Sequence, residues 1–197
     1  MFPGAPATFR PVLTPAQMIR AGVFGGCYFH PRGGKAGIFG RHVAVDHAEF
    51  PAEWFYGIPV HKYRSRKYNK ATNRHRVKSG NSQAFWEGKG WIHENDPRGW
   101  FQWYCRFFCG RRSHDDARQI KRWEACAGPM GRWRGQLCGR VKKSGKRFDD
   151  ETVSPVIRQT LLHWAYALGE GDWEAWCARK RASTQGKHKG NQKGKRR

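Results

Sequence analysis

A run of three carboxylates followed by a histidine is the arrangement in this chain that most resembles a catalytic site. Asp149, Asp150 and Glu151 directly precede a predicted helix, and His163 lies on that helix. Clustered carboxylates can bind the divalent metal of a nuclease, and a histidine can act as its general base. Because the spacing does not require Asp149, Asp150 and His163 to meet, a metal-dependent nuclease or base-processing enzyme is our second alternative. We favour a protein that is not an enzyme.

The cysteines offer a weaker arrangement for binding a metal. Cys105 and Cys109 are four residues apart and would share one face of a helix, and His114 and Cys126 follow. Zinc needs four ligands that converge in a tetrahedron. The Cys-x-x-Cys spacing typical of such sites does not occur, and a buried cysteine behaves as a small apolar residue. We therefore expect no metal and no other cofactor.

Basic residues interleaved with tyrosines are the strongest indication of function. The chain has 38 Lys and Arg against 15 Asp and Glu, and residues 54–86 and 125–148 contain no acid. Lys and Arg neutralise phosphates, and exposed aromatic rings stack on bases. The residues that we expect to contact nucleic acid are Lys62, Tyr63, Arg64, Arg66, Lys67, Tyr68, Lys70, Arg74, Arg76, Lys78, Arg132, Arg134, Arg140, Lys142 and Lys143.

The second basic segment falls on a predicted helix that follows another helix after a short turn. The turn, Gly128-Pro129-Met130-Gly131, has the length and glycine content of the turn in a helix-turn-helix. If the second helix entered a major groove, the side chains placed to meet bases and phosphates would be Arg132, Arg134, Gln136 and Arg140. Any helical hairpin with a basic second helix shares this pattern, so groove recognition is the weaker form of the nucleic-acid hypothesis.

Length and charge limit the class of protein. The 197 residues suit one domain with short extensions, and a net charge of +23 is too large for internal ion pairs to neutralise. No stretch has the roughly 18 consecutive apolar residues that cross a bilayer, so we expect no membrane association. The ten Trp, twelve Phe and six Tyr predict a folded aromatic core. The expected partner is DNA or RNA, in a ribonucleoprotein or chromatin assembly.

The cysteine pattern also bears on the compartment. The six cysteines include no Cys-x-x-Cys pair, and no apolar secretory segment precedes them. This pattern predicts a reducing, intracellular compartment, with the nucleus favoured. Residues 1–45 lack acids, so a mitochondrion or another organelle is the alternative, and with it a ribosome-associated organellar ribonucleoprotein subunit. The absence of Ser from the same segment argues against a typical transit peptide.

The elements that must position these residues are mainly helices. Thr14-Pro15-Ala16-Gln17 has the form of a capping box and predicts a short helix that ends at Gly22. Five aromatic residues at helical spacing predict a core helix within residues 96–110. Further helices are predicted over residues 113–128, 130–143, 154–168 and 172–182.

The N-terminal half is less regular. Gly25-Gly26, Gly33-Gly34, Gly37 and Gly40 divide it into loops and short extended pieces, and residues 49–55 predict one or two helical turns. Residues 61–80 have no period of 2 or 3.6 and predict a basic loop with one short strand pair.

The predicted fold class is mainly α, a compact bundle of four to five helices with a Gly-rich, irregular N-terminal half. We divide the chain into an irregular segment over residues 1–13, one globular domain over residues 14–178 and a disordered basic tail over residues 179–197.

Several segments of the chain are similar to the signature of a widespread uncharacterised protein family. The signature segments are GWFQWYCRFF at 99–108, GRR at 110–112, DD at 115–116, RQI at 118–120, RW at 122–123 and SPVIRQTLLHW at 154–164. Shorter matching pieces are GVFGG at 22–26, EFP at 49–51, WF at 54–55 and KGWI at 89–92. The resemblance covers most of residues 14–168. It implies a single domain and carries no established activity.

Overall fold

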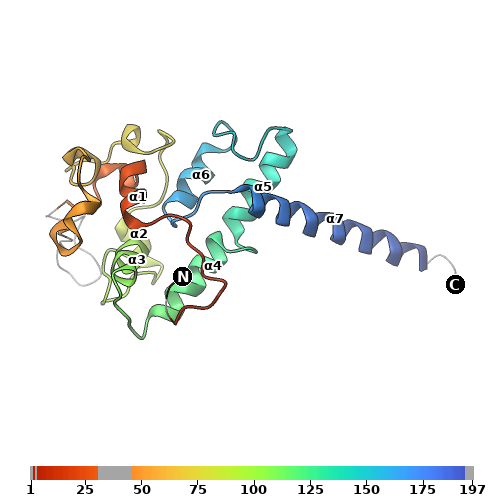
Figure 1. Cartoon of the computed structure of the whole chain (residues 1–197), viewed down its shortest axis with the longest axis horizontal. Helices are drawn as coiled ribbons and strands as arrows, with labels where there is room; N and C mark the ends of the chain where they lie inside the picture. The colour runs from red at the N-terminus through yellow and green to blue at the C-terminus, as the bar shows by residue number, and fades with distance from the viewer. Residues whose placement is uncertain (1, 3, 31–45, 194–197) are drawn as a thin grey trace.

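The protein is mainly helical, as predicted (Figure 1). The computed structural model describes residues 2, 4–30 and 46–193, and within these ranges it contains helices and 3-10 turns but no strand. The glycines predicted to break residues 33–40 into loops lie outside the described ranges. Helices α4 (Asp116–Ala127), α5 (Arg132–Ser144) and α6 (Pro155–Leu162) pack against one another in sequence order, and α1 (Pro15–Ala21) packs on α3 (Trp100–Phe108). The described chain thus forms a helical bundle preceded by an irregular N-terminal half.

The capping box predicts the first helix correctly. Helix α1 spans Pro15–Ala21, and the Thr14 hydroxyl accepts a hydrogen bond from the Gln17 backbone N–H. The Gln17 side chain accepts one from the Thr14 N–H in return. Gly22 ends the helix with a φ of 94°, which glycine adopts without strain.

Residues 60–74 fold back over the end of α1 instead of pairing as strands. The 3-10 turns Val60–Lys62 and Lys70–Thr72 lie in this segment, and its backbone N–H groups donate to the carbonyls of Gly22, Gly25 and Gly26. A Cβ on any of these three glycines would collide with the segment. The predicted strand pair is therefore wrong, because the backbone groups are satisfied by a close-packed loop.

Two further turns and one helix complete the first half. The helical turns predicted within residues 49–55 are present as the 3-10 turns His47–Glu49 and Ala52–Trp54, and another turn spans Phe24–Gly26. Helix α2, Gln83–Gly88, was not predicted. The Ser82 hydroxyl caps it by accepting a hydrogen bond from the Phe85 N–H.

The aromatic helix α3, Trp100–Phe108, is the centre of the core. Seven of its nine side chains are buried, spread around the helix, and Trp103 is fully buried, whereas Arg106 and Phe108 reach solvent. The helix begins later than the sequence predicts because Asp96 does not cap it. The buried Asp96 carboxylate instead forms ion pairs with Arg106 at 3.1 Å and Arg111 at 2.6 Å.

The remaining helices lie close to their predicted positions. Helix α4 spans Asp116–Ala127, α5 spans Arg132–Ser144, α6 spans Pro155–Leu162 and α7 spans Glu170–Lys193. Helix α6 ends before residue 168 because Ala165 has a left-handed φ of 54°, which reverses the chain. None of the helices in the described ranges is both long and apolar enough to span a bilayer, and all six cysteines are free.

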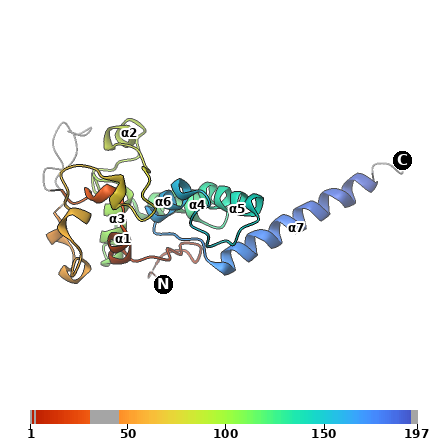
Figure 2. The same ribbon diagram turned by 90° about the horizontal axis from the view of Figure 1, so that it is seen from above.

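Helix α7 extends away from the bundle in both views (Figures 1 and 2). Only its first turns are attached: Trp176 is buried, and Asp172 pairs with Arg134 of α5 at 2.5 Å. The helix continues past its predicted end near residue 182 and covers residues 179–193, where the composition predicts a tail. Residues 179–184 are exposed, and Arg179 at the start of this stretch donates a hydrogen bond to the Pro129 carbonyl at 3.0 Å. Disorder of the tail stays a prediction.

Removing the charge of Asp96 should destabilise the whole bundle. The Asp96→Asn variant removes a buried carboxylate, so that Arg111 loses its counter-charge and Arg106 keeps only Glu49. We expect this change to lower the free energy of unfolding by about 3 kcal/mol. Urea unfolding at pH 7 measures the change. The matched control is Asp149→Asn, because Asp149 is an exposed carboxylate paired only with Arg147. Equal stability of the two variants would contradict the role given to Asp96.

Candidate nucleic-acid interface

The three candidate catalytic residues are not brought together. Asp149 is exposed and paired with Arg147, while Asp150 accepts hydrogen bonds from Thr152 and pairs with Lys146. His163 is buried, and its ring stacks on Phe24 with the centroids 4.3 Å apart. The carboxylates thus have partners within their own turn, and the histidine belongs to a different environment.

The four candidate metal ligands lie in different environments, two of them buried and two exposed. Cys105 and Cys126 are buried, whereas Cys109 and His114 are exposed. Burial raises the pKa of the Cys105 thiol well above its usual value and that of Cys126 to about 12. Within the described ranges, no group of three or more His, Cys, Asp or Glu is placed to hold a metal ion.

The first basic segment presents most of its charges to solvent. Lys62 and Arg64 are partly buried, and Arg74 pairs with Glu151 at 2.9 Å. Tyr63 is buried against Phe55, so its ring has no free face for a base. Besides Arg74, the exposed members of the segment are Arg66, Lys67, Tyr68, Lys70, Arg76 and Lys78.

Tyr68 is partly exposed and partly packed against the protein. Its ring is 41% exposed but lies against Gly25, where a Cβ would collide with it. Its hydroxyl accepts hydrogen bonds from the Asn73 side chain and the Ser79 N–H. One edge of the ring is thus tied to the protein, which leaves a smaller surface for stacking than the sequence predicts.

Helix α5 separates its predicted contact residues into two faces. Leu137, Cys138 and Val141 face the core, and Arg134 lies with them, 4% exposed and paired with Asp172. Arg134 is therefore a structural residue. The opposite, exposed face carries Arg132, Gln136, Arg140, Lys142 and Lys143. It contains no carboxylate.

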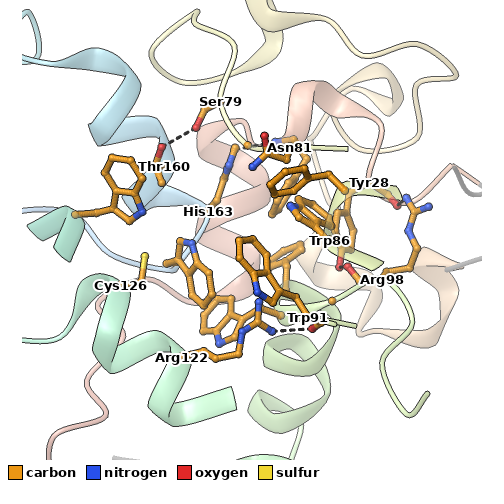
Figure 3. Close-up of a pocket in the computed structure, with 18 of the residues that line it drawn as sticks. Tyr28, Ser79, Asn81, Trp86, Trp91, Arg98, Arg122, Cys126, Thr160 and His163 are labelled. Atoms are coloured by element: carbon orange, nitrogen blue, oxygen red, sulfur yellow. Dashed lines mark hydrogen bonds between the residues drawn. The ribbon is translucent and has the colours of Figure 1, made fainter. Parts of the chain in front are cut away.

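An aromatic pocket of about 790 Å³ lies where several segments of the chain converge (Figure 3). Its walls come from the turn at Phe24, the loop before α2, α2 itself, the loop between α2 and α3, the start of α3, α4, the start of α5 and α6. The aromatic lining residues are Phe24, Tyr28, Phe85, Trp86, Trp91, Trp100, Phe101, Trp133, His163 and Trp164. The volume falls within the range of roughly 300–1,000 Å³, and the lining is mainly apolar and aromatic, as in typical small-molecule sites.

The charge of the pocket is entirely positive. Lys78, Arg98, Arg122 and Arg132 line it, and no Asp or Glu does. None of these four forms an ion pair with a carboxylate in the described ranges. Burial lowers the pKa of Arg122 to about 10, and the neighbouring charge of Arg118 adds to this effect. The guanidinium of Arg122 is still charged at neutral pH and faces a site that has no negative group.

His163 is held in one protonation state. Its Nε2 accepts a hydrogen bond from the Phe24 N–H at 3.1 Å, and a backbone N–H can only donate. The Gln159 side-chain nitrogen lies 3.1 Å from the same atom. Burial lowers the pKa of His163 to about 3. The ring is therefore neutral at physiological pH and carries its proton on Nδ1.

Sequence reasoning missed the pocket because its residues are scattered along the chain. Trp91, Arg98 and Arg122 lie outside the basic segments. Comparisons of the chain with protein-family models, curated proteins and solved structures found no match.

The neutral state of His163 predicts an acid-sensitive fold. In the unfolded chain the imidazole has a pKa of about 6.5, whereas in the folded protein it is about 3. Between these values the unfolded state binds more protons, so stability falls as the pH drops from 6.5 towards 3. Between pH 7 and pH 5 the wild type should lose about 2 kcal/mol more than His163→Gln.

Urea unfolding at both pH values measures this difference. The glutamine carbonyl can accept from the Phe24 N–H without titrating, so His163→Gln keeps the hydrogen bond and removes only the proton site. If both proteins lose the same stability between pH 7 and pH 5, His163 is not held neutral in the folded protein.

Proposed function

We propose that this protein binds nucleic acid without catalysing a reaction on it. The binding surface, which we call the basic surface, combines the exposed part of residues 66–78 with the outer face of α5. Its basic residues are Arg66, Lys67, Lys70, Arg76, Lys78, Arg132, Arg140, Lys142 and Lys143. Lys and Arg on such a surface replace the counterions of a phosphate backbone.

One observation carries the proposal: two basic segments far apart in the sequence meet at one pocket. Lys78, the last charge of the first segment, and Arg132, the first charge of α5, both line it. A solubilising role for basic residues has no need of such convergence, and it does not explain aromatic rings between the two segments. Phosphate contacts beside exposed aromatic rings are the usual composition of a surface for nucleic acid.

The outer face of α5 also suits close approach of a strand. Gly135 and Gly139 lie on this face, and no atom stands within 4 Å of where their Cβ atoms would be. Packing therefore does not require glycine at either position, although each costs about 1 kcal/mol relative to alanine inside a helix. A flat helix surface between basic side chains lets a phosphate backbone come close to the helix.

The exposed start of the C-terminal basic segment adds charge at a distance. Arg179, Lys180 and Arg181 are exposed on α7, which leads away from the bundle (Figure 2). We expect these residues to strengthen long-range attraction without choosing a binding register.

Removing two charges from α5 tests the surface. Arg140→Gln combined with Lys143→Gln should weaken binding to a 20-base-pair duplex and reduce the slope of log affinity against log salt by about 1.8, or 0.9 for each lost phosphate contact. Fluorescence anisotropy over a salt series measures both. The matched control is Arg10→Gln with Arg20→Gln, two exposed residues outside the basic surface. Negligible affinity of the wild type at low salt, or affinity that salt does not change, would contradict the proposal.

Substituting the two glycines of α5 tests its role in binding independently of its role in stability. Gly135→Ala and Gly139→Ala should each raise the free energy of unfolding by up to about 1 kcal/mol and weaken duplex binding severalfold, because a methyl group enters the path of the strand. Gly171→Ala is the control, since Gly171 lies in α7 with equally open space around its Cβ position. That variant should not alter binding. Unchanged binding in all three variants would remove α5 from the interface.

A further inference from the structure

The open side of the pocket is made of aromatic rings that reach solvent. Trp91 is 40% exposed and Phe85 41% exposed, and their rings meet edge to face with the centroids 5.8 Å apart. Both line the cavity, so they stand at its mouth. Deeper in the pocket lie Trp100 and Trp164, whose centroids are 4.9 Å apart. Such a cavity favours a flat aromatic ligand, which can stack on or between these rings.

The position of Arg122 favours a ligand that carries a negatively charged group beside its aromatic ring. Its guanidinium lies 5.8 Å from the centre of the Trp91 ring and 5.6 Å from that of Trp164. One nitrogen donates to the Trp91 carbonyl at 3.0 Å and to the Gln119 side-chain oxygen at 2.9 Å. These are neutral acceptors, and Asp115, whose charge favours the Arg122 cation, is itself bound by Arg118 and Gln119. Lys78 and Arg132 add positive charge to the same cavity.

Polar groups that suit the edge of a heterocycle also line the cavity. The Nδ1–H of His163 follows from the acceptor role of Nε2, and none of the described residues accepts a hydrogen bond from it. His163 is only 7% exposed, and the nearest atom to a Cβ on Gly80 would be this Nδ1, at 3.8 Å. Glycine at this position therefore leaves the space beside Nδ1 open. Asn81 lines the cavity near His163 in Figure 3 and offers a donor and an acceptor.

We propose that the pocket binds one nucleobase together with its phosphate, supplied as an unpaired nucleotide of the strand that lies on the basic surface. The base stacks on the tryptophans and meets the Nδ1–H of His163, and the phosphate lies near Arg122. The volume of about 790 Å³ falls within the range of roughly 300–1,000 Å³ typical of small-molecule sites. The choice of a strand as the source rests on the proposed function, whereas the chemistry of the pocket does not.

Two duplexes that differ by one unpaired nucleotide test whether a bound strand supplies the nucleotide. Both share the same sequence, and one carries a single bulged adenosine. By fluorescence anisotropy the wild type should bind the bulged duplex about tenfold more tightly, the gain expected from stacking one base. Trp91→Ala and Arg122→Gln should reduce this ratio towards one and change affinity for the paired duplex by less than about twofold. Tyr56→Ala, which removes a 67% exposed ring elsewhere, should leave the ratio unchanged.

Free nucleotides test the pocket without the strand. Titration with adenosine monophosphate should quench the intrinsic tryptophan fluorescence to saturation, and adenosine should bind about tenfold more weakly because it lacks the phosphate. Arg122→Gln should remove the difference between the two ligands. Since Trp91 is substantially exposed, Trp91→Ala is expected to fold, and its urea unfolding curve checks this.

The outcomes separate the two proposals. Equal, salt-dependent affinity for both duplexes would overturn the pocket as a strand site and leave the basic surface intact. If neither duplex binds but the monophosphate quenches saturably, the proposed function fails and the pocket is a site for a free nucleotide. If neither the bulge nor the monophosphate distinguishes the wild type from Trp91→Ala, the pocket proposal is overturned.

Discussion

The burial of most side chains of helix α3 is the constraint on which the other elements depend. Its three largest polar aromatics each bond to another segment. Trp100 donates to the Gln119 carbonyl at 3.3 Å, Trp103 to the Asp116 carboxylate at 2.8 Å and Tyr104 to the Leu13 carbonyl at 2.7 Å. A buried donor without its partner costs about 1–3 kcal/mol. Helix α4 and the N-terminal segment are therefore fixed by hydrogen bonds as well as by apolar contact.

The same helix orders the wall of the pocket. The Tyr28 hydroxyl accepts from the Gln102 N–H of α3 and donates to the Arg98 carbonyl. Arg98, which is buried, donates to the Tyr28 carbonyl and to the side chain of Gln83 in α2. Three segments that are separate in the sequence are thus joined by reciprocal bonds, and a change in any one of them would move the others. The shape of the pocket therefore depends on the hydrogen bonds that join these segments to the core helix α3.

Most of the helices could be predicted from the sequence because their signals are local. Capping residues and periodic aromatic residues identify α1 and α3 without knowledge of the rest of the chain. The burial of Arg134 was also readable, since it lies three, four and seven residues before Leu137, Cys138 and Val141 and so shares their face. The sequence-based prediction grouped it with the other charges of α5 by type instead of by face.

The pocket could not be predicted in this way. Phe24, Trp91, Arg122 and His163 come together only after four separate segments have packed, and no spacing along the chain relates them. The loop over residues 60–74 illustrates the same limit. Its glycine partners at Gly22, Gly25 and Gly26 are consistent with a turn, a break or a close contact, and only the tertiary structure distinguishes these. Local signals predict elements, whereas sites between elements depend on how the elements pack.

The charged guanidinium of Arg122 destabilises the folded protein, and this destabilisation bears on the function of the pocket. Arg122 is largely buried beside Arg118, and both its desolvation and this neighbouring charge lower its pKa to about 10, which means that the folded protein disfavours the cation. An uncharged side chain of similar length could donate to the Trp91 carbonyl without that penalty. A strongly perturbed cation in a concave aromatic site is more typical of binding than of structural support. On the proposed binding, an anion that enters the pocket offsets the penalty of keeping Arg122 charged.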